Sequence, residues 1–129
     1  MNQLTITLAG NRTGFRPGDM LRGTAEWQLP NGPAAVEMRL GWWIEVQGII
    51  EVRRVQTARF DRVLANDSRE FQFPLPDAPY SYAGSLATLS WVVELVVLPQ
   101  CQFTQVFFNL GPNAEPVQLQ EQLNSDEAI

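Results

Sequence analysis

The sequence contains no histidine and no lysine, so all nine of its basic residues are arginine. Without histidine there is no Ser/His/Asp or Cys/His nucleophilic site, no histidine-ligated zinc or iron, and no imidazole switch near neutral pH. Without lysine, and with a formal net charge of −5, a basic face for a nucleic-acid backbone is not expected. We therefore expect a non-enzymatic protein with no cofactor, no metal and no nucleic acid partner.

Cysteine and long apolar runs are also scarce. Cys101 is the only cysteine, which excludes an intrachain disulfide, and we expect it to be half-buried near a turn. The longest apolar stretch, residues 91–98, is eight residues long and includes Glu94, whereas a membrane-spanning helix needs about 20 residues. The N-terminus lacks the basic and apolar regions of a signal peptide. These features predict a cytoplasmic protein without an integral membrane segment.

Apolar and polar residues alternate along most of the chain, which is the pattern of half-buried β-strands. The alternating runs cover residues 4–8, 21–29, 36–46, 71–75, 89–97 and 103–110. A further run over residues 49–63 changes phase across Arg53 and Arg54, which predicts a β-bulge before Val55.

Turn-forming residues separate these runs at regular intervals. Pro17 and Gly18 suit the two central positions of a type II turn, and further breaks fall at residues 30–33, 65–68 and 75–79. About seven strands with such turns, and no long helical pattern, predict an all-β fold with two antiparallel sheets packed as a β-sandwich. We expect residues 1–112 to form this single domain.

The composition shifts after residue 112. Four acidic residues in residues 113–129 account for four of the five net negative charges. We expect this segment to be an acidic, partly mobile C-terminal tail. Two local structures remain open: Val117 and Leu119 fit a last edge strand, whereas Leu119 and Leu123 fit one face of a helix.

Three segments, in this order, match motifs of a known family. They are FRPGDMLRG at residues 15–23, FQFPLP at residues 71–76, and PYSYAG at residues 79–84 followed by LSWVV at residues 89–93. The first is similar to the "aromatic, x, Pro-Gly-acid, x, aliphatic, x, Gly" opening of the arrestin-like N-terminal domain family, and the others resemble its next strand and return strand. The resemblance implies an arrestin-like, immunoglobulin-like sandwich.

The same resemblance implies a scaffold that holds a protein partner. Two-sandwich arrestins carry a second domain and a phosphate-sensing lysine pair, and trafficking arrestins carry a Pro-Pro-x-Tyr motif; this sequence has none of these. Phosphate sensing and ubiquitin-ligase recruitment are therefore not implied. The chain most resembles a single-domain, bacterial sporulation-control-like member, and a shared fold does not identify its partner.

Trp43 is the first candidate interface residue. Strict alternation places Trp42 on the core face and leaves Trp43 on the opposite face, and Val92 and Val96 are likewise out of phase with Trp91. We expect Trp43, Val92 and Val96 to form an outer apolar surface that binds a protein partner or a second copy of the chain. Coverage by a loop or by residues 113–123 is the alternative, and an exposed strand edge is another route to association.

Two other interpretations remain open. Arg53, Arg54, Arg59 and Arg62 are close in sequence and suit an anion-binding face, although the acidic residues interleaved with them also fit a solvated strand face with weak ion pairs. A carbohydrate-binding jelly-roll module is the alternative function, with exposed Trp43 and Trp27 as stacking platforms.

Overall fold

The computed structural model describes residues 3–118, and strands account for most of them. The strands are β1 (Gln3–Leu8), β2 (Gly14–Phe15), β3 (Met20–Gln28), β4 (Ala35–Val46), β5 (Ile49–Asp61), β6 (Asn66–Pro74), β7 (Tyr82–Ala83), β8 (Ala87–Leu98), β9 (Gln102–Leu110) and β10 (Val117–Gln118). A single 3₁₀ turn, η1 (Ala9–Asn11), is the only helical element in the described part of the chain. The all-β class predicted from the alternation is confirmed.

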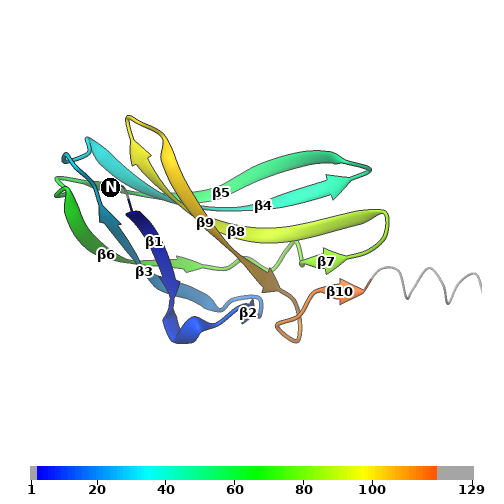
Figure 1. Ribbon diagram of the computed structural model, residues 1–129. Helices are drawn as coiled ribbons and strands as arrows, with labels where there is room; N and C mark the ends of the chain where they lie inside the picture. Colours follow the sequence, from blue (N-terminus) through cyan, green and yellow to red (C-terminus); the bar gives the residue numbers. More distant parts are fainter. Residues whose placement is uncertain (1–2, 119–129) are drawn as a thin grey trace, which may run out of the picture.

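The strands form two sheets (Figure 1). The smaller sheet has the order β1-β3-β6, and the larger has the order β10-β7-β8-β4-β5. Strands β7 and β9 share one edge of β8, since β7 pairs with residues 88–89 and β9 with residues 91–97. The long strands pair antiparallel, and only the short β2 and β10 pair parallel with a neighbour in the described residues. This is the expected two-sheet antiparallel sandwich.

The core lies between the two sheets and is formed by one face of each long strand. Its largest fully buried side chains are Trp27, Trp91, Phe73, Leu21, Met38, Leu40, Leu95 and Leu110. The two indole N–H groups in this core donate hydrogen bonds to backbone carbonyls, Trp27 to Leu64 at 2.9 Å and Trp91 to Pro79 at 2.8 Å. Burial of the rings therefore leaves no polar group unpaired.

Two local predictions are confirmed by the backbone. Gly18 has a φ of 83°, and the Asp19 N–H donates to the Arg16 carbonyl at 3.0 Å, which closes the predicted turn. The pairing of β4 with β5 shifts register between Leu40 and Gly41 and leaves Val55 unpaired, which is the predicted bulge.

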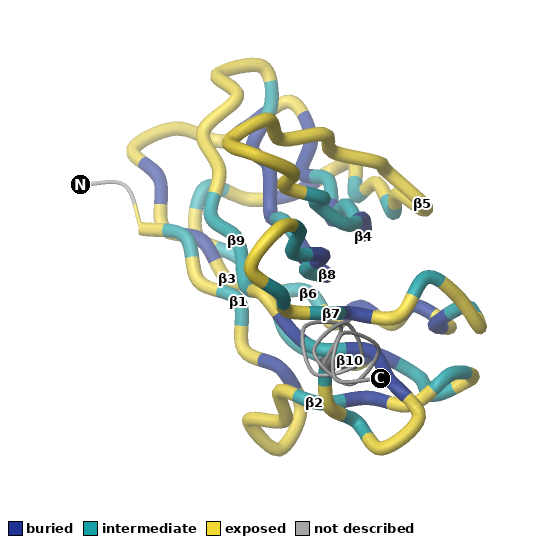
Figure 2. Tube along the Cα trace, turned by 90° about the vertical axis from the view of Figure 1, so that its right-hand side faces the viewer, coloured by how far each residue is buried: buried dark blue, intermediate teal, exposed yellow. Residues whose placement is uncertain are grey.

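The hairpin of β4 and β5 extends beyond the smaller sheet (Figure 1). The first nine residues of β5 are all exposed, and only Ala58 and Phe60 near its other end pack against the core. Figure 2 shows β5 as an exposed strand along most of its length. One half of β5 therefore has no second layer on either face among the described residues.

The larger sheet continues past the expected domain boundary at residue 112. The Val117 N–H donates to the Ser81 carbonyl at 2.8 Å, and β10 pairs parallel with β7. Val117 thus belongs to an edge strand, one of the two structures left open above, while the expectations for Leu119, Leu123 and the end of the tail lie outside the described residues. Cys101 lies exposed in the turn between β8 and β9, not half-buried as expected.

Candidate protein-interaction surface

The register of the larger sheet brings apolar side chains together on its solvent side. Trp43 of β4 lies opposite Val52 of β5 and Ser90 of β8. Val92, two residues further along β8, lies opposite Phe107 of β9. Because residues directly opposite each other point to the same face, these side chains share the outer face. We call the set Trp43, Val52, Val92, Val96, Phe103 and Phe107 the outer patch.

Trp43 and Phe107 are in direct contact within this patch. Their ring centroids are 5.0 Å apart and their planes are nearly perpendicular, at 86°. Val92 belongs to β8, the strand between the two rings, and is only 1% exposed although no second layer covers this face in the described residues. Phe107 itself remains 43% exposed. The two rings therefore offer a partly exposed aromatic surface on a well-packed base.

Val96 lies at the other end of the patch. Its neighbours across the sheet are Glu37 on β4 and Phe103 on β9, and it is 4% exposed, whereas Phe103 is 58% exposed. A polar row formed by Arg39 and Glu94 separates Val96 from the aromatic pair. All three residues named from the sequence are on the outer face, but only Trp43 and Val92 lie side by side.

The sequence reasoning missed the two phenylalanines and Val52. Phe107 and Phe108 are adjacent in one strand, so alternation requires one of them to face outward. Phe108 takes the core position and is 2% exposed. This adjacency was the available signal for Phe107, whereas the position of Val52 depends on the bulge that follows it.

An ion-pair network borders the patch. Glu37 accepts hydrogen bonds from Arg39 and from Arg59, with N–O distances of 2.8 Å and 3.2 Å. Arg59 also contacts Asp61 at 3.1 Å. The hydrogen bond and charge of Asp61, with a smaller contribution from Glu37, raise the pKa of Arg59 above its ordinary value. Because Arg59 is about half exposed, solvent screens these pairs and their contribution to stability is small.

The four arginines named for an anion-binding face are spread over the molecule. Arg53 lies opposite Trp42 on the inner side of the sheet, whereas Arg54 lies opposite Gly41 on the outer side. Arg59 is held by two carboxylates, and Arg62 follows β5 in a turn with a φ of 57°. The structure does not bring them together on one face.

The carbohydrate-binding alternative loses one of its two stacking platforms. Trp27 is 1% exposed and belongs to the core, so the expectation of an exposed Trp27 is wrong. Trp43 is half-buried and meets Phe107 edge to face. An open aromatic face of the kind that stacks on a sugar is therefore not offered by Trp27, and Trp43 offers only part of its surface.

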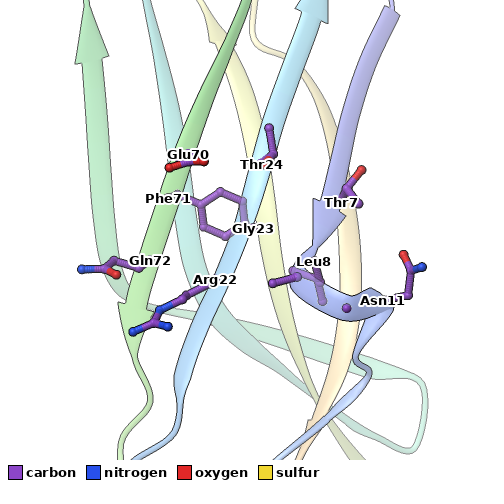
Figure 3. Close-up of a pocket in the computed structure, with 11 residues that line it drawn as sticks. Thr7, Leu8, Asn11, Arg22, Gly23, Thr24, Glu70, Phe71 and Gln72 are labelled. Atoms are coloured by element: carbon purple, nitrogen blue, oxygen red, sulfur yellow. The ribbon is translucent and has the colours of Figure 1, made fainter.

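A hollow of about 620 Å³ lies on the smaller sheet, around Gly23 (Figure 3). Polar side chains from three segments line it: Thr7, Asn11, Arg22, Thr24, Glu70 and Gln72. Its only ring, Phe71, is 6% exposed, and Glu70 is its only acidic residue. A single carboxylate does not provide the acid pair of glycoside hydrolysis.

Two further searches were confined to the described residues 3–118. No cluster of three or more metal-ligating side chains occurs there. Within the same range, no helix is both long and apolar enough to cross a membrane.

Comparison with known proteins gives a likeness of fold. No protein-family model and no curated protein matches the sequence. Among solved structures, the chain is similar to Spo0M, a sporulation control protein from Bacillus subtilis, with a TM-score of 0.57 and 12% sequence identity. The match covers 84% of this chain and 49% of that one, so this chain spans about half the length of its neighbour. The arrestin-like sandwich expected from the motifs is thereby confirmed as a fold.

Proposed function

We propose that this domain is a non-enzymatic, cytoplasmic adaptor that binds a protein partner through the outer patch. The observation that carries the proposal is the Trp43 and Phe107 ring pair, which remains partly exposed on a sheet face with no second layer in the described residues. Aromatic residues at the centre of an interface contribute strongly to binding. A soluble domain that keeps such a pair at its surface is best explained by a partner that covers it.

The surroundings of the ring pair support the same function. Interfaces combine an apolar centre with a polar, solvent-accessible rim. Here the rim is formed by Glu37, Arg39 and Arg59, whose charges are already paired with one another. A partner with an apolar surface and a polar border fits this face without leaving a buried charge unpaired.

The sequence and the structural neighbour support the adaptor class. The chain has no histidine, which removes the commonest catalytic base and metal ligand. Spo0M is described as a sporulation control protein, a regulatory role, although the likeness in itself concerns only the fold. The cytoplasmic assignment is supported by the lone cysteine.

Affinity capture tests this function. The wild-type chain, a Trp43→Glu variant and a Thr5→Glu variant are immobilised and exposed to cytoplasmic extract of the source organism. Thr5 is an exposed residue on the outer side of the smaller sheet, so Thr5→Glu adds the same charge away from the patch. We expect a protein captured by wild type and Thr5→Glu to be reduced at least tenfold with Trp43→Glu, while circular dichroism shows all three folded.

Two results would contradict the proposal. Equal capture by Trp43→Glu and wild type would remove the outer patch as the binding surface. No captured protein, together with tight binding of a small molecule in a metabolite screen, would remove the adaptor function.

A further inference from the structure

Strand β5 has a free edge. It is 13 residues long and is the last strand of the larger sheet, with β4 on one side and no strand on the other among the described residues. Such an edge presents unpaired backbone N–H and C=O groups that another strand can pair with. It contains no proline, which is one of the residues that block edge pairing.

The exposed side chains of β5 include several large apolar ones. Ile49 is 70% exposed, Ile50 51%, Val52 50% and Val55 46%. β-Branched residues of this kind favour strand pairing, in which neighbouring side chains cover one another. The apolar half of β5 is also the half that projects beyond the smaller sheet (Figure 1). A further strand can therefore reach this edge without meeting the second layer.

The charges of the same segment are self-complementary. Glu51 and Arg53 flank Val52 and lie opposite Ile44 and Trp42, so both point to the inner face. Neither makes an ion pair or a hydrogen bond through its side chain in the described part of the chain. In an antiparallel pair centred on Val52, Glu51 of each copy lies opposite Arg53 of the other. Opposite charges at such positions stabilise a strand pair.

We propose that β5 pairs with β5 of a second copy of this chain, antiparallel about a two-fold axis at Val52. Charge selects this register over its neighbours. An axis at Glu51 would place two glutamates against each other, and an axis at Arg53 would place two arginines against each other, which is unfavourable at directly opposite positions. A two-fold axis also gives the closed symmetry that most soluble homo-oligomers have.

This pairing deepens the proposed function, on which the role of the joined surface rests. Trp43 lies opposite Val52. In the dimer, Val52 of one copy lies opposite Val52 of the other, so the two outer patches meet across the axis. The larger sheets then form one continuous sheet, and an adaptor built in this way presents a doubled apolar face to its partner.

Charge exchange tests the register. Glu51→Arg and Arg53→Glu each place like charges opposite one another in the homodimer. We expect each single variant to dimerise at least tenfold more weakly than wild type by analytical ultracentrifugation. The double variant Glu51→Arg/Arg53→Glu restores both opposite-charge pairs. An equimolar mixture of the two single variants also restores them in a heterodimer, so both samples should recover the dimer mass.

Disulfide cross-linking tests the position of the axis. In a Cys101→Ser background, Val52→Cys brings two thiols face to face, so mild oxidation should give a cross-linked dimer. Thr57→Cys is the matched control, because Thr57 is exposed on the same strand and the same face. In the proposed dimer the two Thr57 positions are about 30 Å apart, five residues from the axis on each side, so this variant should remain uncross-linked.

Several outcomes would overturn the pairing. These are a wild type that stays monomeric at high concentration, single charge variants that dimerise as wild type does, and equal cross-linking of Val52→Cys and Thr57→Cys. The proposed function fails separately. A monomeric wild type that loses its partner on Trp43→Glu removes only the β5 pairing, whereas a β5 dimer whose capture is insensitive to Trp43→Glu removes only the role of the outer patch.

Discussion

Trp43 of β4 and Phe107 of β9 meet edge to face above β8, with ring centroids 5.0 Å apart. The two residues are separated by a whole strand, so only long side chains bridge the distance. Val92 of β8 is 1% exposed on the same face. We infer that the two rings keep Val92 dry and act as a small second core on the solvent side of the sheet.

A double-mutant cycle measures this contact. Trp43→Ala and Phe107→Ala should each lower the free energy of unfolding, and the double variant should lower it by less than their sum. The expected coupling is about 0.5–1.5 kcal/mol, typical of an aromatic pair. Urea denaturation provides the four values. Phe103→Ala combined with Trp43→Ala serves as the control cycle, and equal coupling in the two cycles would contradict a specific ring contact.

The orientation of individual side chains could be predicted from local sequence. Alternation assigned Trp42 to the inner face and Trp43 to the outer face, and the structure agrees. The phase change near Val55 indicated the bulge, and Pro17 with Gly18 indicated the turn. These features depend on backbone geometry over a few residues, which neighbouring side chains determine.

The pairing between distant segments could not be predicted in this way. The contact of Trp43 with Phe107 depends on which strands neighbour β8 and in which register. The charge of Arg59 is paired with Glu37, 22 residues away, which no local pattern reveals. Trp27 alternates as a core residue and as a surface residue equally well on paper. Its burial follows from the position of the other sheet.

Gly23 should not tolerate a side chain. A Cβ at this position would lie 2.6 Å from the Thr7 carbonyl oxygen and 2.7 Å from the ring of Phe71, both held in the sandwich. We expect Gly23→Ala to lower the free energy of unfolding by about 2 kcal/mol or more through overpacking. Gly32→Ala is the control, since its Cβ would meet nothing closer than 3.9 Å. Similar melting temperatures for the two variants would contradict this account.

Ser81 is the buried polar residue of the PYSYAG segment, and it fastens the end of β9. It is 1% exposed, and its hydroxyl oxygen accepts a hydrogen bond from the Leu110 N–H at 2.9 Å. Ser81→Ala leaves that buried N–H without its acceptor, which costs about 1–3 kcal/mol. Chemical denaturation should show this loss, whereas Ser85→Ala, at an exposed position, should be neutral. Equal stability of Ser81→Ala and wild type would mean that water replaces the hydroxyl.

Asp67 makes the stability of the fold dependent on pH. Its carboxylate accepts hydrogen bonds from the backbone N–H groups of Leu64 and Ser68, and Arg69 lies nearby. These backbone hydrogen bonds, followed by the interaction with Arg69, lower the pKa of Asp67. A carboxyl whose pKa is lower in the folded state stabilises the protein above its unfolded-state pKa, about 3.9. This contribution is lost as the pH falls through the folded-state value.

The prediction is that Asp67→Asn destabilises the protein at neutral pH and reduces the difference from wild type as the sample is acidified below about pH 4. The Asn oxygen accepts one backbone hydrogen bond at most as an uncharged group, so the loss at neutral pH reflects the missing charge. Melting curves of both proteins from pH 7 to pH 3 provide the comparison. Asp77→Asn, at an exposed carboxyl without a side-chain partner in the described residues, is the control. A constant difference between Asp67→Asn and wild type across this range would show that geometry, and not the charge of Asp67, stabilises the turn before β6.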